Sequence, residues 1–359
     1  MIYSRIWISL IVMFLIFWGA INVCYASKAR MLALGQSSDY GSFYIKDSRS
    51  IFLNPATINQ QKNYFITELG SASSSDSNPN SEGGIIFDFA DFVWGVYLGS
   101  EINANNSART AANFLAKDNR VDFLFGGDAG FTWGARGHFA AGKDRQSAVD
   151  RSYSAVGIGL GVSIDKVDGY CNFDLQDVAN GATIKDDKWE TDLGMKLGVA
   201  YNFLGSTFFI DYEKNGFKSS VGDITHKSEQ KINVGAGTTF QLDSVSKLFA
   251  DLKYYSDTEK ISGTADLELT EYGLPLCLGF ETQIMPWLFL RASIKQSFIG
   301  GEENSSGDFK SFSNTTDVST GITITVGKVN IDGMVGQDRD GNKQGSFGSV
   351  TNFSLAYKF

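Results

Sequence analysis

Apolar and polar residues alternate along most of this chain, in successive segments of roughly ten residues. In one clear segment, the first face carries Leu288, Leu290, Ala292 and Ile294, and the second carries Phe289, Arg291, Ser293 and Lys295. Residues two apart point to the same face of an extended strand, so this period predicts β-strands with one apolar face. No apolar run after residue 26 is long enough for a membrane-spanning helix. The chain therefore has to be built from strands.

The connections between these segments follow a regular order. We expect sixteen strands, near residues 62–71, 83–90, 92–100, 119–127, 129–140, 152–163, 168–178, 188–202, 205–214, 226–240, 245–256, 266–282, 286–297, 311–327, 328–337 and 348–359. Long polar connections such as Ser71–Gly83, Glu101–Asp118 and Gly300–Lys310 alternate with short ones such as Asp165–Asp168, Phe203–Ser206 and Gly327–Lys328. A fourteen-strand arrangement is the alternative, because the strand pairs at 83–100 and 311–337 are the least well defined.

A transmembrane β-barrel and a soluble β-sandwich would both show this alternation. Segments such as Thr191–Tyr201 and Lys231–Phe240 are long for a sandwich, in which strands of about 5–6 residues are the commonest. Short turns at one end and long loops at the other are typical of outer-membrane barrels. Phe353, Leu355, Tyr357 and Phe359 share a face, and a terminal aromatic such as Phe359 is typical of the signal that barrel-assembly machinery reads. We therefore predict an all-β fold, a transmembrane antiparallel β-barrel of 14–16 strands.

The first 26 residues have the pattern of an export signal. Arg5 precedes an apolar run from Ile6 to Ile21, and Ala26 offers a small residue for cleavage. A membrane anchor and a lipoprotein signal at Cys24 are the alternatives, although Val23 is bulky for lipoprotein processing. We predict a signal peptide at 1–26 and a multi-pass protein of the bacterial outer membrane, in contact with its lipids, with both barrel ends in the periplasm. The net charge of −9 argues against nucleic acid as a partner.

Residues 27–61 do not alternate, and they precede the barrel that we expect over 62–359. They contain Arg30, Leu34-Gly35, Asp47 and the tripeptide Asn54-Pro55-Ala56 in the order that resembles the FadL-type family of outer-membrane channels for hydrophobic compounds. Further matches are Trp94-Gly95, Trp133-Gly134, Leu274-Pro275-Leu276 and Gly279-Phe280-Glu281 before Trp287 and Arg291. The resemblance covers the N-terminal third and residues 272–296.

The resemblance implies fourteen strands and a 27–61 segment folded into the barrel as a plug, or hatch. Irregular backbone cannot lie in lipid, where unpaired polar groups are costly, but it can lie in a polar lumen. The alternative is that Asn54-Pro55-Ala56 is only a turn before the first strand. The resemblance also implies passive uptake of fatty-acid-like hydrophobic small molecules. A general diffusion porin and a non-transport surface scaffold or adhesin remain as alternatives.

The second face of the strands carries charges of both signs, which suits a hydrated or plugged lumen. Our candidates for the lumen lining are Arg136, His138, Phe209, Asp211, Phe249, Asp251, Phe289 and Arg291. The aromatic ones, together with Trp287, could line an apolar pocket or form a girdle near the rims. Inward glycines at 157, 159 and 161 would allow close approach of backbone or ligand. Cys171 and Cys277 are expected to face lipid without forming a disulfide.

Signals of catalysis are absent from the sequence. His138 and His226 are the only histidines, no Cys/His spacing suggests zinc, and no nucleophile elbow or phosphate loop occurs. Asp338, Asp340 and Asn342 faintly resemble a calcium loop, but a hairpin tip explains them better. We expect no metal, no cofactor and no enzyme activity. A short solvated helix is expected at Ser107–Lys117, within the second long connection.

Overall fold

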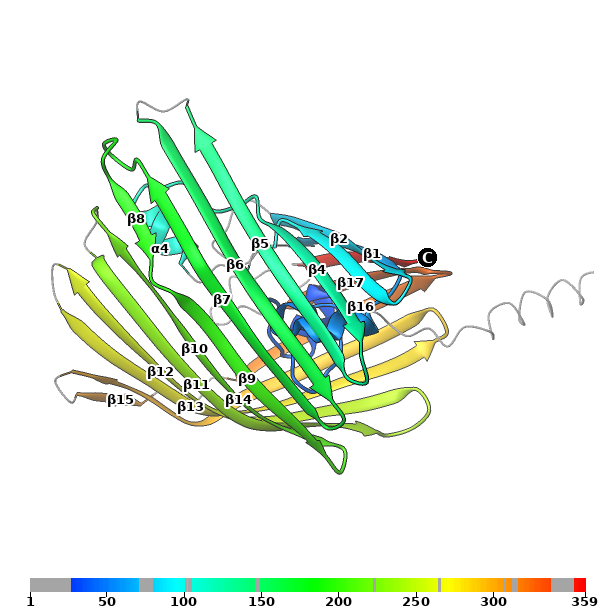
Figure 1. The fold of residues 1–359 in the computed structure, drawn as a ribbon. Coiled ribbons are helices and arrows are strands. Elements are labelled where there is room, and N and C mark those ends of the chain that lie inside the picture. The colour runs from blue at the N-terminus through cyan, green and yellow to red at the C-terminus, as the bar shows by residue number, and fades with distance from the viewer. Residues whose placement is uncertain are drawn as a thin grey trace, which may run out of the picture.

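The chain forms one closed antiparallel β-barrel, in which the last strand pairs with the first (Figure 1). The computed structural model describes residues 27–70, 80–100, 102, 105–145, 149–221, 224–263, 266–305, 308–311, 316–336 and 352–359. The predicted signal peptide and the predicted hairpin tip at Asp338–Asn342 lie outside the described residues. No helix among the described residues is long and apolar enough to span a membrane.

Within the described residues, eighteen strands share a single sheet. They are β1 (Tyr64–Gly70), β2 (Asn80–Phe89), β3 (Phe92–Leu98), β4 (Val121–Asp128), β5 (Thr132–Asp144), β6 (Arg151–Ile164), β7 (Val167–Asn180), β8 (Lys188–Thr191), β9 (Gly194–Phe203), β10 (Ser206–Ser219), β11 (Ile224–Gln241), β12 (Ser246–Gly263), β13 (Leu267–Met285), β14 (Leu288–Asn304), β15 (Phe309–Ser311), β16 (Thr316–Val326), β17 (Val329–Gly336) and β18 (Asn352–Lys358).

Two of the barrel positions hold a broken strand. β8 and β9 both lie between β7 and β10, and β15 and β16 both pair with β14. The eighteen strands therefore make sixteen positions, which confirms the predicted sixteen and its strand order. The fourteen strands that the family resemblance implied are wrong for this chain.

Short turns and long connections lie at opposite ends of the barrel. At the short end, the Phe359 backbone N–H donates to the Asn63 carbonyl at 3.0 Å, which brings both ends of the barrel sequence together. Turns of two to four residues at this end use left-handed backbone, for example at Asp165 and Leu204, whose φ angles are 49° and 51°. The longest strands are β11 to β14, which have 17 to 19 residues.

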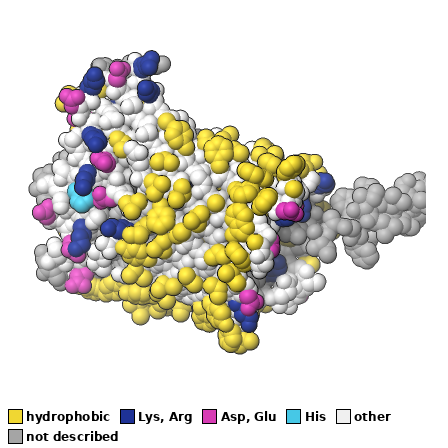
Figure 2. Space-filling view, in the orientation of Figure 1, with side chains coloured by type: hydrophobic (Ala, Val, Ile, Leu, Met, Phe, Trp, Pro, Cys, Tyr) yellow, Lys and Arg dark blue, Asp and Glu magenta, His cyan; other side chains and the backbone are white. Residues whose placement is uncertain are grey.

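The two faces of the sheet differ sharply in chemistry. On β10, Phe208 and Ile210 point outward and are 50% and 52% exposed, whereas Phe209 and Asp211 point inward and are 9% and 5% exposed. Figure 2 shows the same pattern over the visible wall, where hydrophobic side chains form a broad outer surface and charges gather at the loop end. An apolar exterior with a polar interior is the pattern of a transmembrane barrel, and the inverse of a soluble sandwich.

The N-terminal segment, residues 27–61, lies against the inner face of the barrel (Figure 1). It contains α2 (Lys28–Ala33), α3 (Ser50–Leu53) and the 3₁₀ helix η1 (Pro55–Gln60). Helix α2 contacts β14, β16, β17 and β18, and η1 contacts β3 to β6. Most of its side chains are buried, so the segment forms a packed body with the wall.

A second irregular segment lies between β3 and β4. It contains α4 (Asn106–Ala111), so a helix is present where the sequence predicted one, although it is shorter than Ser107–Lys117. The expectation that this helix would be fully solvated is wrong, because Arg109 is buried and pairs with Asp177 on β7. Phe114 packs beside the stacked rings of Trp189 and Phe217.

Candidate functional site

The Asn54-Pro55-Ala56 turn docks on a floor of glycines. The Asn54 side chain accepts a hydrogen bond from the Ala56 N–H at 3.0 Å, and Pro55 begins η1, where its missing N–H costs nothing. A Cβ on Gly134 of β5 or on Gly161 of β6 would lie 2.7 Å from the Ala56 nitrogen. Only glycine lets the turn approach the wall this closely.

Wall side chains complete the docking of this turn. Arg136 donates to the Phe52 carbonyl at 3.1 Å, and Asn172 donates to the Leu53 carbonyl at 2.9 Å. In the other direction, the Asn59 amide donates to the Trp133 carbonyl at 2.8 Å. Backbone groups that the turn leaves unpaired thus find partners on the wall.

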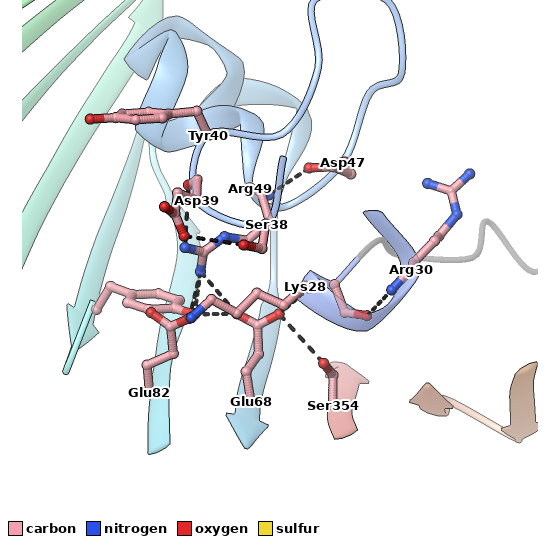
Figure 3. Close-up of polar contacts among 12 residues, drawn as sticks. Lys28, Arg30, Ser38, Asp39, Tyr40, Asp47, Arg49, Glu68, Glu82 and Ser354 are labelled. Carbon is pink, nitrogen blue, oxygen red and sulfur yellow. Dashed lines mark hydrogen bonds and ion pairs between the residues drawn. The ribbon is translucent and has the colours of Figure 1, made fainter. Parts of the chain in front are cut away.

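A buried ion-pair network holds α3 to β1 and β2 (Figure 3). The Arg49 guanidinium lies 2.9 Å from Glu68, 3.1 Å from Glu82 and 3.0 Å from the Tyr97 hydroxyl. Lys28 also pairs with Glu82. These side chains are nearly inaccessible to solvent, so removing one partner would leave a buried charge uncompensated.

A second network holds α2 to β13, β14 and β17. Arg30 binds both oxygens of Glu281 on β13, at 2.8 and 3.2 Å, and Arg291 on β14 shares that carboxylate at 2.5 Å. Arg291 also lies 3.3 Å from Asp332, which accepts a hydrogen bond from Ser27 at 2.9 Å. The predicted lumen residue Arg291 therefore belongs to the anchorage of the segment.

Asp47 is buried three residues before α3, which begins at Ser50. Its Oδ1 accepts the backbone N–H groups of Arg49 at 2.6 Å and Ser50 at 3.1 Å, as an N-cap carboxylate does. Its Oδ2 is buried and has no hydrogen-bond partner among the described residues. Burial raises the pKa of Asp47 to about 6, against the opposing effects of Arg30 and of these two N–H groups.

The loop between α2 and α3 contacts β10 to β13. Phe43 stacks on Phe209 with a centroid distance of 4.5 Å, and Tyr44 donates to Asp251 at 2.7 Å. Gln36 donates to the same carboxylate at 2.8 Å. Phe249 is buried against Met31, Leu34 and Ile45. Three predicted lumen residues, Phe209, Phe249 and Asp251, thus contact the N-terminal segment.

The remaining predicted residues lie elsewhere on the inner face. His138 is buried, with Nε2 3.0 Å from Asp174, and Asp211 accepts a hydrogen bond from Asn233 at 2.6 Å. Phe289 is buried, whereas Trp287 is 40% exposed in the turn before β14, at the rim. Among the described residues, no group of three or more His, Cys, Asp or Glu side chains could hold a metal ion.

The two cysteines have different environments. Both are free, and Cys171 alternates with the inward residues Tyr170 and Asn172, so it points outward. The expectation that Cys277 would also face lipid is wrong. Its thiol is buried on the inner face, 3.6 Å from the Leu34 carbonyl. The sequence did contain a signal for this orientation, because the opposite, outward face of the strand is formed by Leu274, Leu276, Leu278 and Phe280.

A cavity of about 650 Å³ lies between the N-terminal segment and β9 to β17. Its floor is formed by Gly35 to Tyr44, including the rings of Tyr40 and Phe43, and Phe209 and Met334 add to its apolar part. Its walls carry the charged side chains Lys196, Asp211, Glu213, Lys231, Asp251, Lys253, Lys295 and Asp317. On β14, Lys295 lies beyond Arg291 toward the loop-bearing end, so the cavity is on the loop side of the anchoring networks.

Of the eight predicted lumen residues, three line this cavity, namely Phe209, Asp211 and Asp251. Sequence reasoning missed the anchoring residues Lys28, Arg49, Glu68 and Glu82. The alternation along β1 could have revealed Glu68 as an inward residue, because it shares a face with the buried Tyr64 and Ile66. The orientation of Lys28 and Arg49 could not be predicted in this way, because residues 27–61 show no regular alternation.

No protein-family model matches this sequence, and no curated protein sequence matches it. Solved structures with a similar fold include the Ralstonia pickettii toluene transporter TbuX, at 12% identity over 95% of this chain and 100% of that chain, with a TM-score of 0.39. The P. putida toluene transporter TodX is similar at 12% identity over 94% and 99%, with a TM-score of 0.38. OmpT, an outer membrane protein of Vibrio cholerae, is similar at 12% identity over 83% and 98%, with a TM-score of 0.38. At this identity the likeness concerns the barrel fold and assigns no function.

Proposed function

We propose that this protein is an outer-membrane channel in which residues 27–61 are a plug, and that it takes up small molecules with an apolar part by passive diffusion. The observation that carries the proposal is the position of the cavity, on the loop side of a segment that is tied to the inner wall. A volume of about 650 Å³ suits a small-molecule ligand. The long loops would face the outside and both barrel ends the periplasm.

The nature of the anchorage supports a plug that moves. Beside apolar packing around Phe52, it contains ion pairs and hydrogen bonds in which Arg30 and Arg49 meet carboxylates of the wall. Water can solvate such groups when they separate, so displacement of the segment costs less than opening an apolar core of the same size. Transfer would run down a concentration gradient and needs no coupled energy source.

The same contacts disfavour the two alternatives. A general diffusion porin needs an open aqueous path, whereas here an ordered segment contacts the inner wall at β3 to β6, at β14 and at β16 to β18. A surface scaffold would need no cavity with aromatic and charged walls behind its loops. Neither alternative explains why the inner wall supplies glycines and carboxylates to one irregular segment.

A reversible tether between the segment and the wall tests the proposal. A Cβ on Gly35 would lie 2.6 Å from the Cys277 sulfur, so Gly35→Cys in a Cys171→Ser background brings two thiols within reach of a cross-link, at the cost of some strain because φ at Gly35 is 73°. We expect the oxidised protein in vesicles to block entry of a small apolar-group solute, and reduction to restore it. The matched control is the same variant with Cys277→Ser, which should not respond to reductant. Equal entry in the oxidised and reduced states would contradict a moving plug.

A further inference from the structure

The cavity wall carries charges of both signs for which the described part of the chain offers no ion-pair partner. Lys253, Lys295 and Asp317 all line the cavity, and among the described residues none of them forms an ion pair within 4.0 Å or a side-chain hydrogen bond. Other charges nearby are engaged, as Lys196 lies 2.6 Å from Glu213 and Lys231 lies 3.2 Å from Asp257. These three charged residues therefore differ from the neighbouring lysines of the cavity wall, which form ion pairs.

These three residues are neighbours in the sheet. Lys295 on β14 is directly opposite Asp317 on β16 in the strand register. On its other side, Lys295 is opposite Cys277 on β13, which in turn is opposite Asp251 on β12. Lys253 follows two residues after Asp251 on the same face of β12. Two cations and one carboxylate thus lie within a few strand spacings of each other, each about 4.8 Å.

Part of the cavity lining is aromatic. The Phe43 ring stacks on the Phe209 ring. The Lys196 ammonium lies 4.8 Å from the centroid of the Tyr40 ring. A purely apolar ligand would fill this side, but it would also strip water from Lys253, Lys295 and Asp317 without replacing it, which is costly. A ligand of a single charge would satisfy only one sign.

We propose that the cavity binds a small zwitterion with an apolar side group, of the α-amino-acid type. Its carboxylate would lie between Lys253 and Lys295, its ammonium would meet Asp317, and its side group would contact Phe43 and Phe209. This inference rests on the proposed function and names its substrate class. A zwitterion adds no net charge to a wall that already balances both signs, and it supplies each unpaired group with a charge-assisted hydrogen bond.

Calorimetric binding to the whole mature protein in detergent tests this, with phenylalanine as the probe. Phenethylamine, 3-phenylpropionate and toluene are matched comparators that lack the carboxylate, the ammonium or both. A hydrogen bond to a charged group contributes enough for roughly tenfold in affinity, so we expect phenylalanine to bind about tenfold more tightly than either singly charged analogue. Toluene or 3-phenylpropionate binding as tightly as phenylalanine, or phenylalanine not binding, would overturn the proposal.

Variants locate the site. Lys253→Met and Asp317→Asn should each weaken phenylalanine binding about tenfold, by the loss of one such hydrogen bond. Lys260→Met is the matched control, because Lys260 lies on the same strand but is exposed and pairs with Glu268 outside the cavity. Equal loss in the control and in Lys253→Met would overturn the assignment. The Gly35→Cys tether is read out without phenylalanine, so a failure of the ligand leaves the plug test independent.

Discussion

Single glycines on the inner wall decide how closely the N-terminal segment can approach. At Gly161 and Gly134, an added Cβ would meet the backbone of the Asn54-Pro55-Ala56 turn. The sequence suggested that inward glycines allow backbone or ligand to approach the wall closely. The group that approaches Gly161 is the backbone of this turn. Two features thus place the tripeptide. The Asn54 side chain caps the turn, and the glycines opposite leave room for its backbone.

Gly161→Ala should displace this turn. The added methyl overpacks a contact of 2.7 Å to the Ala56 nitrogen, and overpacking of this kind costs about 1–3 kcal/mol. We expect amide hydrogen exchange in residues 56–60 to accelerate by about tenfold or more. Gly137→Ala is the control, because a Cβ there meets nothing within 4 Å. Similar exchange in both variants would show that the glycine floor is not what holds the turn.

The raised pKa of Asp47 predicts that the docking of the N-terminal segment depends on pH. Because its pKa is raised to about 6 in the folded state from 3.8, the carboxyl stabilises the docked segment fully below pH 3.8, and this contribution is lost as the pH rises through 6. Exchange of residues 45–53, corrected for the intrinsic rate, should therefore be faster at pH 7.5 than at pH 5. Asp47→Asn should remove the difference, and a difference that persists in Asp47→Asn would exclude this carboxyl as its cause.

At the scale of elements, the strands were predictable and the N-terminal segment was not. Alternation fixes a strand and its faces, so all sixteen positions and the inward orientation of residues such as Arg136 and Phe249 follow from local sequence. Helices α2 and α3 are too short to show a period, and their positions depend on Glu68, Glu82 and Glu281, which lie far away in sequence. The cavity depends on this docking, so its unpaired lysines could not be distinguished in advance from any other lumen charge.

Arg49→Met should loosen α3 and the loop before it. The change leaves Glu68 and Glu82 facing each other across adjacent strands, and loss of one partner of a buried pair costs about 3–5 kcal/mol. We expect a protease to cleave residues 37–53 in the folded barrel much faster than in the unchanged protein. Lys46→Met provides the comparison, because Lys46 is exposed on the same loop. Arg49→Met cleaved at the rate of Lys46→Met would mean that the network does not anchor the segment.

At the scale of the whole molecule, the outer surface predicts how the barrel responds to lipid. Ile210 lies in the middle of the outward face of β10, where a charge would have to enter the hydrocarbon region. Ile210→Arg should cost about 2–4 kcal/mol and lower the folded fraction in lipid vesicles, measured by the mobility of unheated samples in gels. Leu204→Arg, in an exposed turn, should have little effect. Equal folding of both variants would contradict a lipid-facing wall.

The central claim is that residues 27–61 close this barrel, and conductance in a planar bilayer tests it most directly. The mature protein and a variant lacking residues 27–61 are compared after gel mobility has shown that both are folded. The proposed plug predicts that the intact protein stays closed and that the deletion produces a stable open pore. An intact protein that already conducts as well as the deletion, or a folded deletion that remains closed, would contradict it.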